Sequence, residues 1–197
     1  MEDLSAQYLK YRWFFTGSGK LVIGGKSAIQ NEELLQTLQK NGTNYVVMHT
    51  HDPGSPFSVI LADIQKVSKE DREECAIFTG CFSRAWRERK EMADVDVFSV
   101  AQLEKKKGMK AGTWQVGGKI QRTKVTLALA LTLQEKILRA VPIKTVIKKK
   151  DVLLTIVPGS IDKQQMISTL HVALDEKFSA DAILAALPAG GVKVTAL

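Results

Sequence analysis

Two histidines and an aspartate lie within four positions of one another, at His49, His51 and Asp52. Imidazole and carboxylate groups exchange protons near neutral pH, so these side chains could serve general acid–base chemistry. Two histidines two positions apart on an extended strand also point the same way, which suits joint binding of a metal ion. A third metal ligand is not evident nearby. The pattern leaves two alternatives open, a hydrolytic or metal-dependent enzyme and a loop that only binds.

A second set of groups could bind phosphates. The 197 residues include 28 Lys and Arg against 21 Asp and Glu, which gives a net charge of +7 and a pI near 9.4. This surplus favours a polyanionic partner such as RNA, DNA or an anionic membrane surface. Arg84 and Arg87 lie one turn apart on a predicted helix, with Trp86 between them, although such a run is often only a solvated face. Four lysines belong to a glycine-flanked loop, at Lys105, Lys106, Lys107 and Lys110.

Gly25-Lys26-Ser27, before a predicted helix, superficially matches a phosphate-binding P-loop. That motif requires a glycine where this chain has Lys20, and residues 21–23 predict a strand, so the sequence argues against nucleotide hydrolysis. A glycine pair, Lys26 and a helix start could still hold a single phosphate through backbone N–H groups. The acidic residues near the start of this helix oppose such binding.

The histidines and the aspartate are positioned by the stretch from residue 44 to residue 61. Residues 45–48 form a short apolar run that predicts a buried strand, and residues 57–61 predict a second strand or the start of a helix. The proline, glycine and serine residues between them predict a loop. A loop at the end of a core strand is fixed by the scaffold yet open to ligands, so it is our candidate site.

Other elements follow from periodicity and from turn residues. The opening of the chain predicts a hairpin that ends at Gly24-Gly25, and the pattern then predicts helices over 28–40 and 69–90, each with a capping box, and strands over 94–100 and 124–133. Farther on we expect a hairpin over 143–157 with its turn at 148–151, and helices over 162–178 and 179–187. The result is an α+β fold with a mixed or mainly antiparallel sheet covered by helices, plus a small carboxyl-terminal α+β subdomain.

Composition places the chain among ordinary globular proteins. No apolar run reaches the length of a bilayer span, and the first residues lack the layout of a signal peptide, so we expect a cytoplasmic protein without a membrane partner. Cys75 and Cys81 lie six positions apart in one predicted helix, which predicts two buried thiols in a reducing compartment and no disulfide.

Five blocks in a fixed order resemble the NFACT-R family, the RNA-binding domain of NFACT proteins, which act on stalled large ribosomal subunits in ribosome-associated quality control. The blocks are Trp13-Phe14, LVIGGKSAIQNEEL at 21–34, the loop at 49–56, CFSRAW at 81–86 and ADVDVFSVAQL at 93–103. The resemblance covers roughly residues 8–130. It divides the chain into an NFACT-R-like domain at 1–133 and an extension of unknown role at 134–197.

Carried over residue by residue, the family's Gly-Gly and basic residue correspond to Gly24, Gly25 and Lys26. Its histidine–glycine loop corresponds to His49 and to residues 54–56, and its Ser-Arg-Ala-Trp block to residues 83–86. His51 is an addition to the pattern. The other domains of full-length NFACT proteins have no counterpart here, so we do not expect this chain alone to extend polypeptides on ribosomes.

The resemblance implies a non-enzymatic protein without a cofactor that recognises transfer RNA or ribosomal RNA, including the large ribosomal subunit. The predicted binding residues are Lys26, His49, His51, Asp52, Arg84, Trp86, Arg87, Lys105, Lys106, Lys107 and Lys110. We expect His49 and Asp52 to share a cleft with Lys26 or Arg84. The alternatives are an RNA-directed hydrolase or metal-dependent enzyme that uses His49, His51 and Asp52, and a scaffold that recruits a protein partner through residues 167–188.

Overall fold

The computed structural model describes residues 4–146, 149–162 and 164–195, and six of their strands form the larger of two main sheets. The order across this sheet is β1-β2-β4-β3-β5-β8, and every neighbouring pair is antiparallel. The bounds are β1 Arg12–Phe15, β2 Leu21–Gly24, β3 Tyr45–Thr50, β4 Ser58–Asp63, β5 Met92–Ser99 and β8 Gln121–Thr126. The α+β class and the antiparallel sheet are thereby confirmed.

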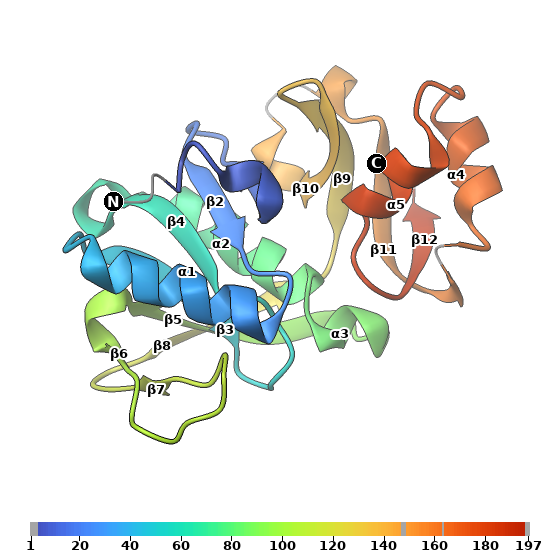
Figure 1. Ribbon diagram of the computed structural model, residues 1–197. Coiled ribbons are helices and arrows are strands. Elements are labelled where there is room, and N and C mark those ends of the chain that lie inside the picture. Colours follow the sequence, from blue (N-terminus) through green and yellow to red (C-terminus); the bar gives the residue numbers. More distant parts are fainter. Residues whose placement is uncertain (1–3, 147–148, 163, 196–197) are drawn as a thin grey trace.

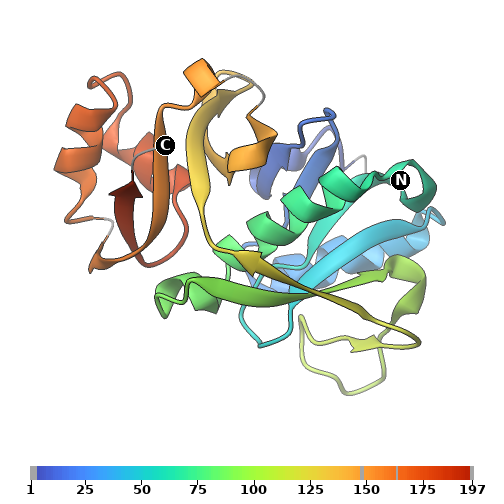
Figure 2. The same ribbon diagram turned by 180° about the vertical axis from the view of Figure 1, so that it is seen from behind.

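Helices cover both faces of this sheet. α1 (Ala28–Lys40) crosses one face (Figure 1), and α2 (Lys69–Cys81) lies on the opposite face (Figure 2). In the central strand β3, Val46 and Met48 belong to the hydrophobic core on the α2 side, whereas Val47 belongs to the core on the α1 side. Because both sides of β3 are buried, its sequence is a continuous apolar run without polar–apolar alternation.

A second sheet lies beside the first, with the order β10-β9-β11-β12 (Figures 1 and 2). Its strands are β9 Leu129–Gln134, β10 Ile137–Pro142, β11 Leu154–Asp162 and β12 Gly191–Thr195, and its helices are α4 Ile167–Ala173 and α5 Ala180–Ala186. Two short strands, β6 Leu103–Glu104 and β7 Gln115–Val116, bracket the lysine-rich loop. Single 3-10 turns lie at Tyr8–Lys10, Ile64–Lys66, Val100–Gln102, Ile143–Thr145 and Lys149–Asp151. Within the described ranges, no helix has the length and apolarity to cross a membrane.

The helix predicted over residues 69–90 is wrong beyond Cys81. The Ser83 hydroxyl donates to the Gly80 carbonyl at 2.7 Å and accepts the Ala85 N–H at 3.0 Å, so it ends α2 and begins a separate short helix, α3 (Arg84–Arg87). A hydroxyl that bonds nearby backbone groups competes with the helical ladder. Cys75 and Cys81 are free and buried, as predicted, and burial raises the pKa of both thiols.

The long strand predicted over residues 124–133 is also wrong, because the chain passes from one sheet to the other within it. β8 ends at Thr126 and β9 begins at Leu129, and between them the Leu127 N–H donates to the Glu91 carbonyl at 2.8 Å. Val125, Leu127 and Leu129 nevertheless belong to one hydrophobic core. The alternation of apolar residues therefore continues across the break, and the pattern does not reveal it.

The hairpin predicted over residues 143–157 does not form. β9 pairs with β10 through a tight turn at Glu135 and Lys136, which both have positive φ, and β11 pairs with β9 and β12. Such turns favour Asn and Gly, so this one has no clear sequence signal. Lys148, in the predicted turn, lies outside the described residues.

The helix predicted over 162–178 shortens to α4, because β11 extends to Asp162. The division into 1–133 and 134–197 stays a prediction.

Asp71 joins the turn of the first hairpin to the start of α2. Its carboxylate accepts the Thr16 hydroxyl at 2.7 Å, the Lys20 ammonium at 2.9 Å and the backbone N–H of Ser68 at 3.0 Å. Burial alone would raise the pKa of Asp71, but bonds from Ser18, Thr16 and Lys20 outweigh it and hold the pKa well below its usual range. The side chain is 1% exposed, so the network is part of the core.

We expect Asp71→Asn to lower the free energy of unfolding by about 2 kcal/mol at pH 7, because charge-assisted bonds are lost from a buried site. The carboxylate contributes its stabilisation above the unfolded-state pKa of about 3.9 and loses it as the pH falls toward the lower folded-state pKa. Urea unfolding should therefore show a smaller difference between wild type and variant at about pH 3 than at pH 7. An equal difference at both pH values would contradict this account.

The matched control is Glu73→Gln. Glu73 forms an exposed ion pair with Lys144, with 3.0 Å between the carboxylate and the ammonium. Because exposed pairs contribute little, its loss should change the free energy of unfolding by less than about 1 kcal/mol at either pH.

Candidate nucleic-acid interface

A cleft of about 640 Å³ is lined mainly by the end of β2, the loop after β3, α3 and the segment before β7. Its volume lies within the range of small-ligand sites. Of the predicted residues it brings together Lys26, His49, His51, Arg84 and Arg87. These side chains come from distant parts of the sequence, so the fold gathers them.

The glycines at the end of β2 allow this close approach. A Cβ atom at Gly25 would lie 2.1 Å from Oδ1 of Asn31 and 2.9 Å from its backbone nitrogen, so any side chain there would collide with α1. Oδ1 of Asn31 also accepts the N–H of Phe57 at 3.2 Å. Gly25 and Asn31 therefore bring the strand end, the helix start and the end of the histidine loop together, and Lys26 follows directly.

The histidine loop is joined to α3 at Gly54. Its carbonyl accepts the N–H of Arg84 at 2.8 Å, and its φ of +115° is accessible to glycine and strained for other residues. A Cβ atom at Gly54 would also lie 3.0 Å from Cβ of Arg84. This contact fixes the position of Arg84 relative to the loop.

The two histidines have different environments. His49 is largely enclosed: its ring centroid lies 4.5 Å from that of Phe57, its Nδ1 is 2.7 Å from the Thr50 carbonyl, and burial lowers its pKa. His51 is exposed, with its Nδ1 3.2 Å from Oδ2 of Asp96 and 2.6 Å from Nη2 of Arg122. In the described ranges no three His, Cys, Asp or Glu side chains gather closely enough to hold a metal ion.

Asp96 and Arg122, which the sequence did not identify as a pair, face each other across β5 and β8. Nε of Arg122 lies 2.6 Å from Oδ1 of Asp96. Burial would raise the pKa of Asp96, but the bonds from Arg122 and His51 outweigh it and lower the pKa. Both charges are thus largely compensated.

Asp52 does not line the main cleft. It lines a smaller neighbouring hollow together with Arg84 and Lys90, and its carboxylate is 3.6 Å from the Lys90 ammonium. The expected shared cleft therefore holds for His49 with Lys26 and Arg84, whereas Asp52 shares only the second hollow with Arg84.

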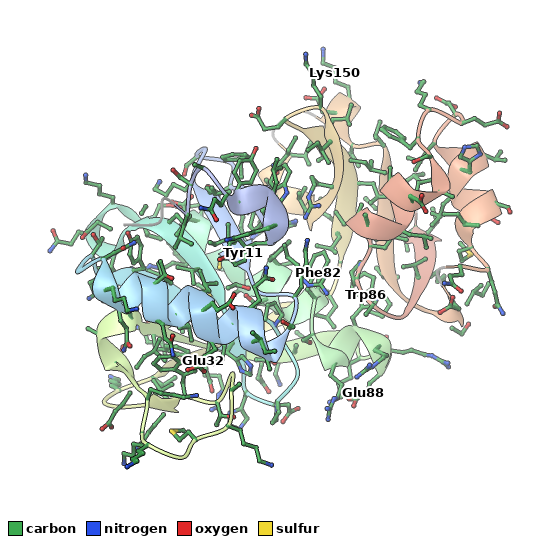
Figure 3. The ribbon with its side chains drawn as sticks, in the orientation of Figure 1. Tyr11, Glu32, Phe82, Trp86, Glu88 and Lys150 are labelled. Carbon is green, nitrogen blue, oxygen red and sulfur yellow. The ribbon has the colours of Figure 1, made fainter. Side chains whose placement is uncertain are left out.

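Lys105 differs from the other lysines of its loop. Its ammonium lies 2.7 Å from Oε2 of Glu32 on α1, and it also donates to the carbonyls of Lys110 and Thr113. Figure 3 shows Glu32 on the side of α1 that faces this loop. Lys105 thereby holds the loop against α1. Lys106, Lys107 and Lys110 are exposed and do not line the cleft, but the residues that follow, 111–114, do.

The tryptophans are packing residues. Trp86 is fully buried between α3 and the second sheet (Figure 3), and its indole N–H donates to the Gly191 carbonyl at 2.9 Å. Trp114 is 9% exposed. A buried indole offers no free face on which a base could stack, so this burial argues against Trp86 as one of the predicted RNA-binding residues. Ala189, just before Gly191, lines the cleft, so the carboxyl-terminal part contributes to the site.

Arg12 is the cleft residue that sequence reasoning missed. It lies in β1, where a lone arginine gives no motif, and its guanidinium carbon is 5.2 Å from the centre of the Phe82 ring. Burial lowers the pKa of Arg12. Its pairing with Gly24 across β1 and β2 places it beside the Gly-Gly-Lys segment.

The chain is similar to known proteins in sequence and in fold. Residues 10–118 match a family model described as the NFACT protein RNA binding domain. Over 80 residues the chain is 38% identical to the archaeal Rqc2 homolog aRqcH of Methanocaldococcus jannaschii, a match that covers 41% of this chain and 12% of that protein. The solved structure of the C-terminal part of the fibronectin/fibrinogen-binding protein from Streptococcus suis shares the fold, with a TM-score of 0.53 and 24% identity over 59% of this chain and 45% of that one. The matches thus span less than half of either relative.

We expect Trp86→Phe to lower the free energy of unfolding by about 1–2 kcal/mol more than Trp114→Phe does. Both changes remove the same atoms, but only Trp86 loses a hydrogen bond and leaves the partly buried Gly191 carbonyl without this donor. The Trp114 indole N–H is buried and has no partner among the described residues. Urea unfolding of the two variants side by side measures the difference, and equal losses would show that the bond to Gly191 contributes nothing.

Proposed function

The chain belongs to the family of NFACT protein RNA-binding domains, and on that premise we propose that it is a non-enzymatic module that binds structured RNA in the cytoplasm. The similarity to a protein named as an Rqc2 homologue supports a role in ribosome-associated quality control. Transfer RNA and ribosomal RNA, including that of the large subunit, are the ligands proposed.

The observation that carries this proposal is an uncompensated positive charge. Four cationic side chains line the cleft, at Arg12, Lys26, Arg84 and Arg87, and none forms an ion pair with a carboxylate among the described residues. The one carboxylate that lines the described cleft is Asp96, which is already paired with Arg122. Phosphates of RNA supply the missing negative charge, and their binding releases counterions.

Neighbouring lysines can extend the contact. Lys106, Lys107 and Lys110 are exposed on the loop whose end forms one wall of the cleft. Lysines on an exposed loop can follow a phosphate backbone without fixing the base sequence. Lys105 is engaged with Glu32 and acts by holding this loop in place.

Hydrolysis of RNA is the second candidate, and one contact favours it. Nδ1 of the exposed His51, at the edge of the cleft, accepts from Nη2 of Arg122 at 2.6 Å, so the Arg122–Asp96 pair fixes the orientation of an imidazole. Incubation of labelled transfer RNA with wild type and with His51→Ala distinguishes the two functions. Cleavage by wild type that the variant lacks would replace the binding proposal with an enzymatic one.

A protein partner at residues 167–188 receives less support. The apolar side chains Leu170, Leu174, Ile183 and Leu187 of this segment are buried in the core. Val172 is 67% exposed, which alone makes a small contact surface. The segment therefore contributes mainly to packing of the second sheet.

We expect the double variant Arg84→Ala/Arg87→Ala to bind transfer RNA and ribosomal RNA fragments more weakly, irrespective of sequence. Each lost phosphate contact removes about 0.7–0.9 from the slope of log affinity against log salt, so the slope should fall by about 1.4–1.8. Alanine keeps the Cβ atom of Arg84 that packs on Gly54. Fluorescence anisotropy at several salt concentrations measures the slope.

Lys66→Ala/Lys69→Ala is the matched control for this double variant. It also removes two charges, from exposed positions at the opposite end of α2 from α3. Its slope should stay close to that of wild type. An unchanged slope for the arginine variant, or an equal loss in both variants, would mean that α3 does not contact phosphates.

A further inference from the structure

Two cations that line the cleft, Arg12 and Lys26, lie near a third cation, Arg139. Arg12 pairs with Gly24 across β1 and β2, Lys26 follows two residues later, and Arg139 of β10 reaches the same hairpin. The Arg139 guanidinium donates to the Trp13 carbonyl from Nε at 3.1 Å and from Nη2 at 2.8 Å. Its carbon also lies 4.6 Å from the centre of the Trp13 ring.

Burial and the charges of these groups lower the pKa values of Lys26 and Arg139, and none of the three side chains has a carboxylate partner among the described residues. Burial, and then the charge of Arg12, lowers the pKa of Arg139 to about 10, so it stays protonated at neutral pH. Partial desolvation, and then the charges of Arg12 and Arg139, lowers the pKa of Lys26. No described carboxylate forms an ion pair with any of the three.

A partly buried group of like charges is costly unless an opposite charge joins it. Arg139 is only 8% exposed and is held by backbone, so a ligand would meet Arg12 and Lys26, with the charge of Arg139 behind them. The stabilisation that a bound anion gives to these cations increases with the negative charge of the anion. A terminal phosphomonoester carries about −1.5 to −2 at neutral pH, whereas each phosphodiester of an RNA backbone carries about −1.

We propose that the part of this cleft lined by Arg12 and Lys26 binds a phosphomonoester at an end of the RNA, with these two side chains as the groups that contact it. The inference rests on the proposed RNA-binding function and adds selection of chain ends to it. The remaining cleft has room for the nucleotide that carries the phosphate, beside the partly exposed side chains of Val116 and Ile120.

The test compares one short single-stranded RNA in three forms, with a 5′-phosphate, with a 3′-phosphate and with hydroxyl groups at both ends. We expect one phosphorylated form to bind about tenfold more tightly than the hydroxyl form by isothermal titration calorimetry. Adenosine 5′-monophosphate, adenosine 3′-monophosphate and adenosine, titrated separately, show whether a free nucleotide is also accepted.

Lys26→Gln and Arg12→Gln should each abolish most of the preference, because each weakens binding of the phosphorylated form about tenfold more than binding of the hydroxyl form. Lys26 is exposed, so its variant tests the proposal even if Arg12→Gln fails to fold. Arg84→Gln should weaken all three forms alike, and Lys66→Gln should change none.

The outcomes separate this inference from the proposed function. Equal binding of the three forms by wild type, or a preference that survives Lys26→Gln, overturns the end-selective site and leaves RNA binding intact. Failure of every RNA, including transfer RNA and ribosomal RNA fragments, to bind would instead overturn the proposed function.

Discussion

The burial of β3 on both faces is the constraint on which the rest of the molecule depends. Val46 and Met48 pack toward α2 and Val47 packs toward α1, and all three are fully buried. Each such side chain contributes about 1.5–3 kcal/mol by leaving water, so the strand cannot shift by one residue without losing both cores. The histidine loop begins where this strand ends, so the fixed position of β3 also fixes the part of the cleft that this loop lines.

Local patterns were enough to predict most elements near the site. Each of these elements is determined by residues close to it in the sequence. The examples are the apolar run at residues 45–48, the cap at Ser27 and the alternation at residues 94–100. The errors arose where a distant contact decides the local structure. Leu127 continues the apolar alternation of β8 although its chain is leaving the sheet, and Ser83 ends a helix whose periodicity continues.

The residues of the site were also hard to predict from the sequence. Whether a basic side chain is available to bind phosphate depends on its neighbours in space, which the sequence does not give. Lys105 is neutralised by Glu32, 73 positions away, whereas Arg12, an isolated arginine in a strand, has no carboxylate partner among the described residues. The resemblance to NFACT-R identified Lys26, His49 and Arg84 because these residues lie in blocks that match the family's motifs. It could not identify Arg12 or the compensation of Asp96 by Arg122, which depend on the pairing of strands.

The bond between the Trp86 indole and the Gly191 carbonyl bears on how the cleft forms while the chain is being synthesised. It joins residues 105 positions apart, and the neighbouring Ala189 forms part of the wall of the cleft. Since ribosomes make the amino-terminal part first, the larger sheet can form while synthesis continues, but this wall is absent until residue 189 has been added. Until that residue has been added, a nascent chain therefore lacks the finished cleft.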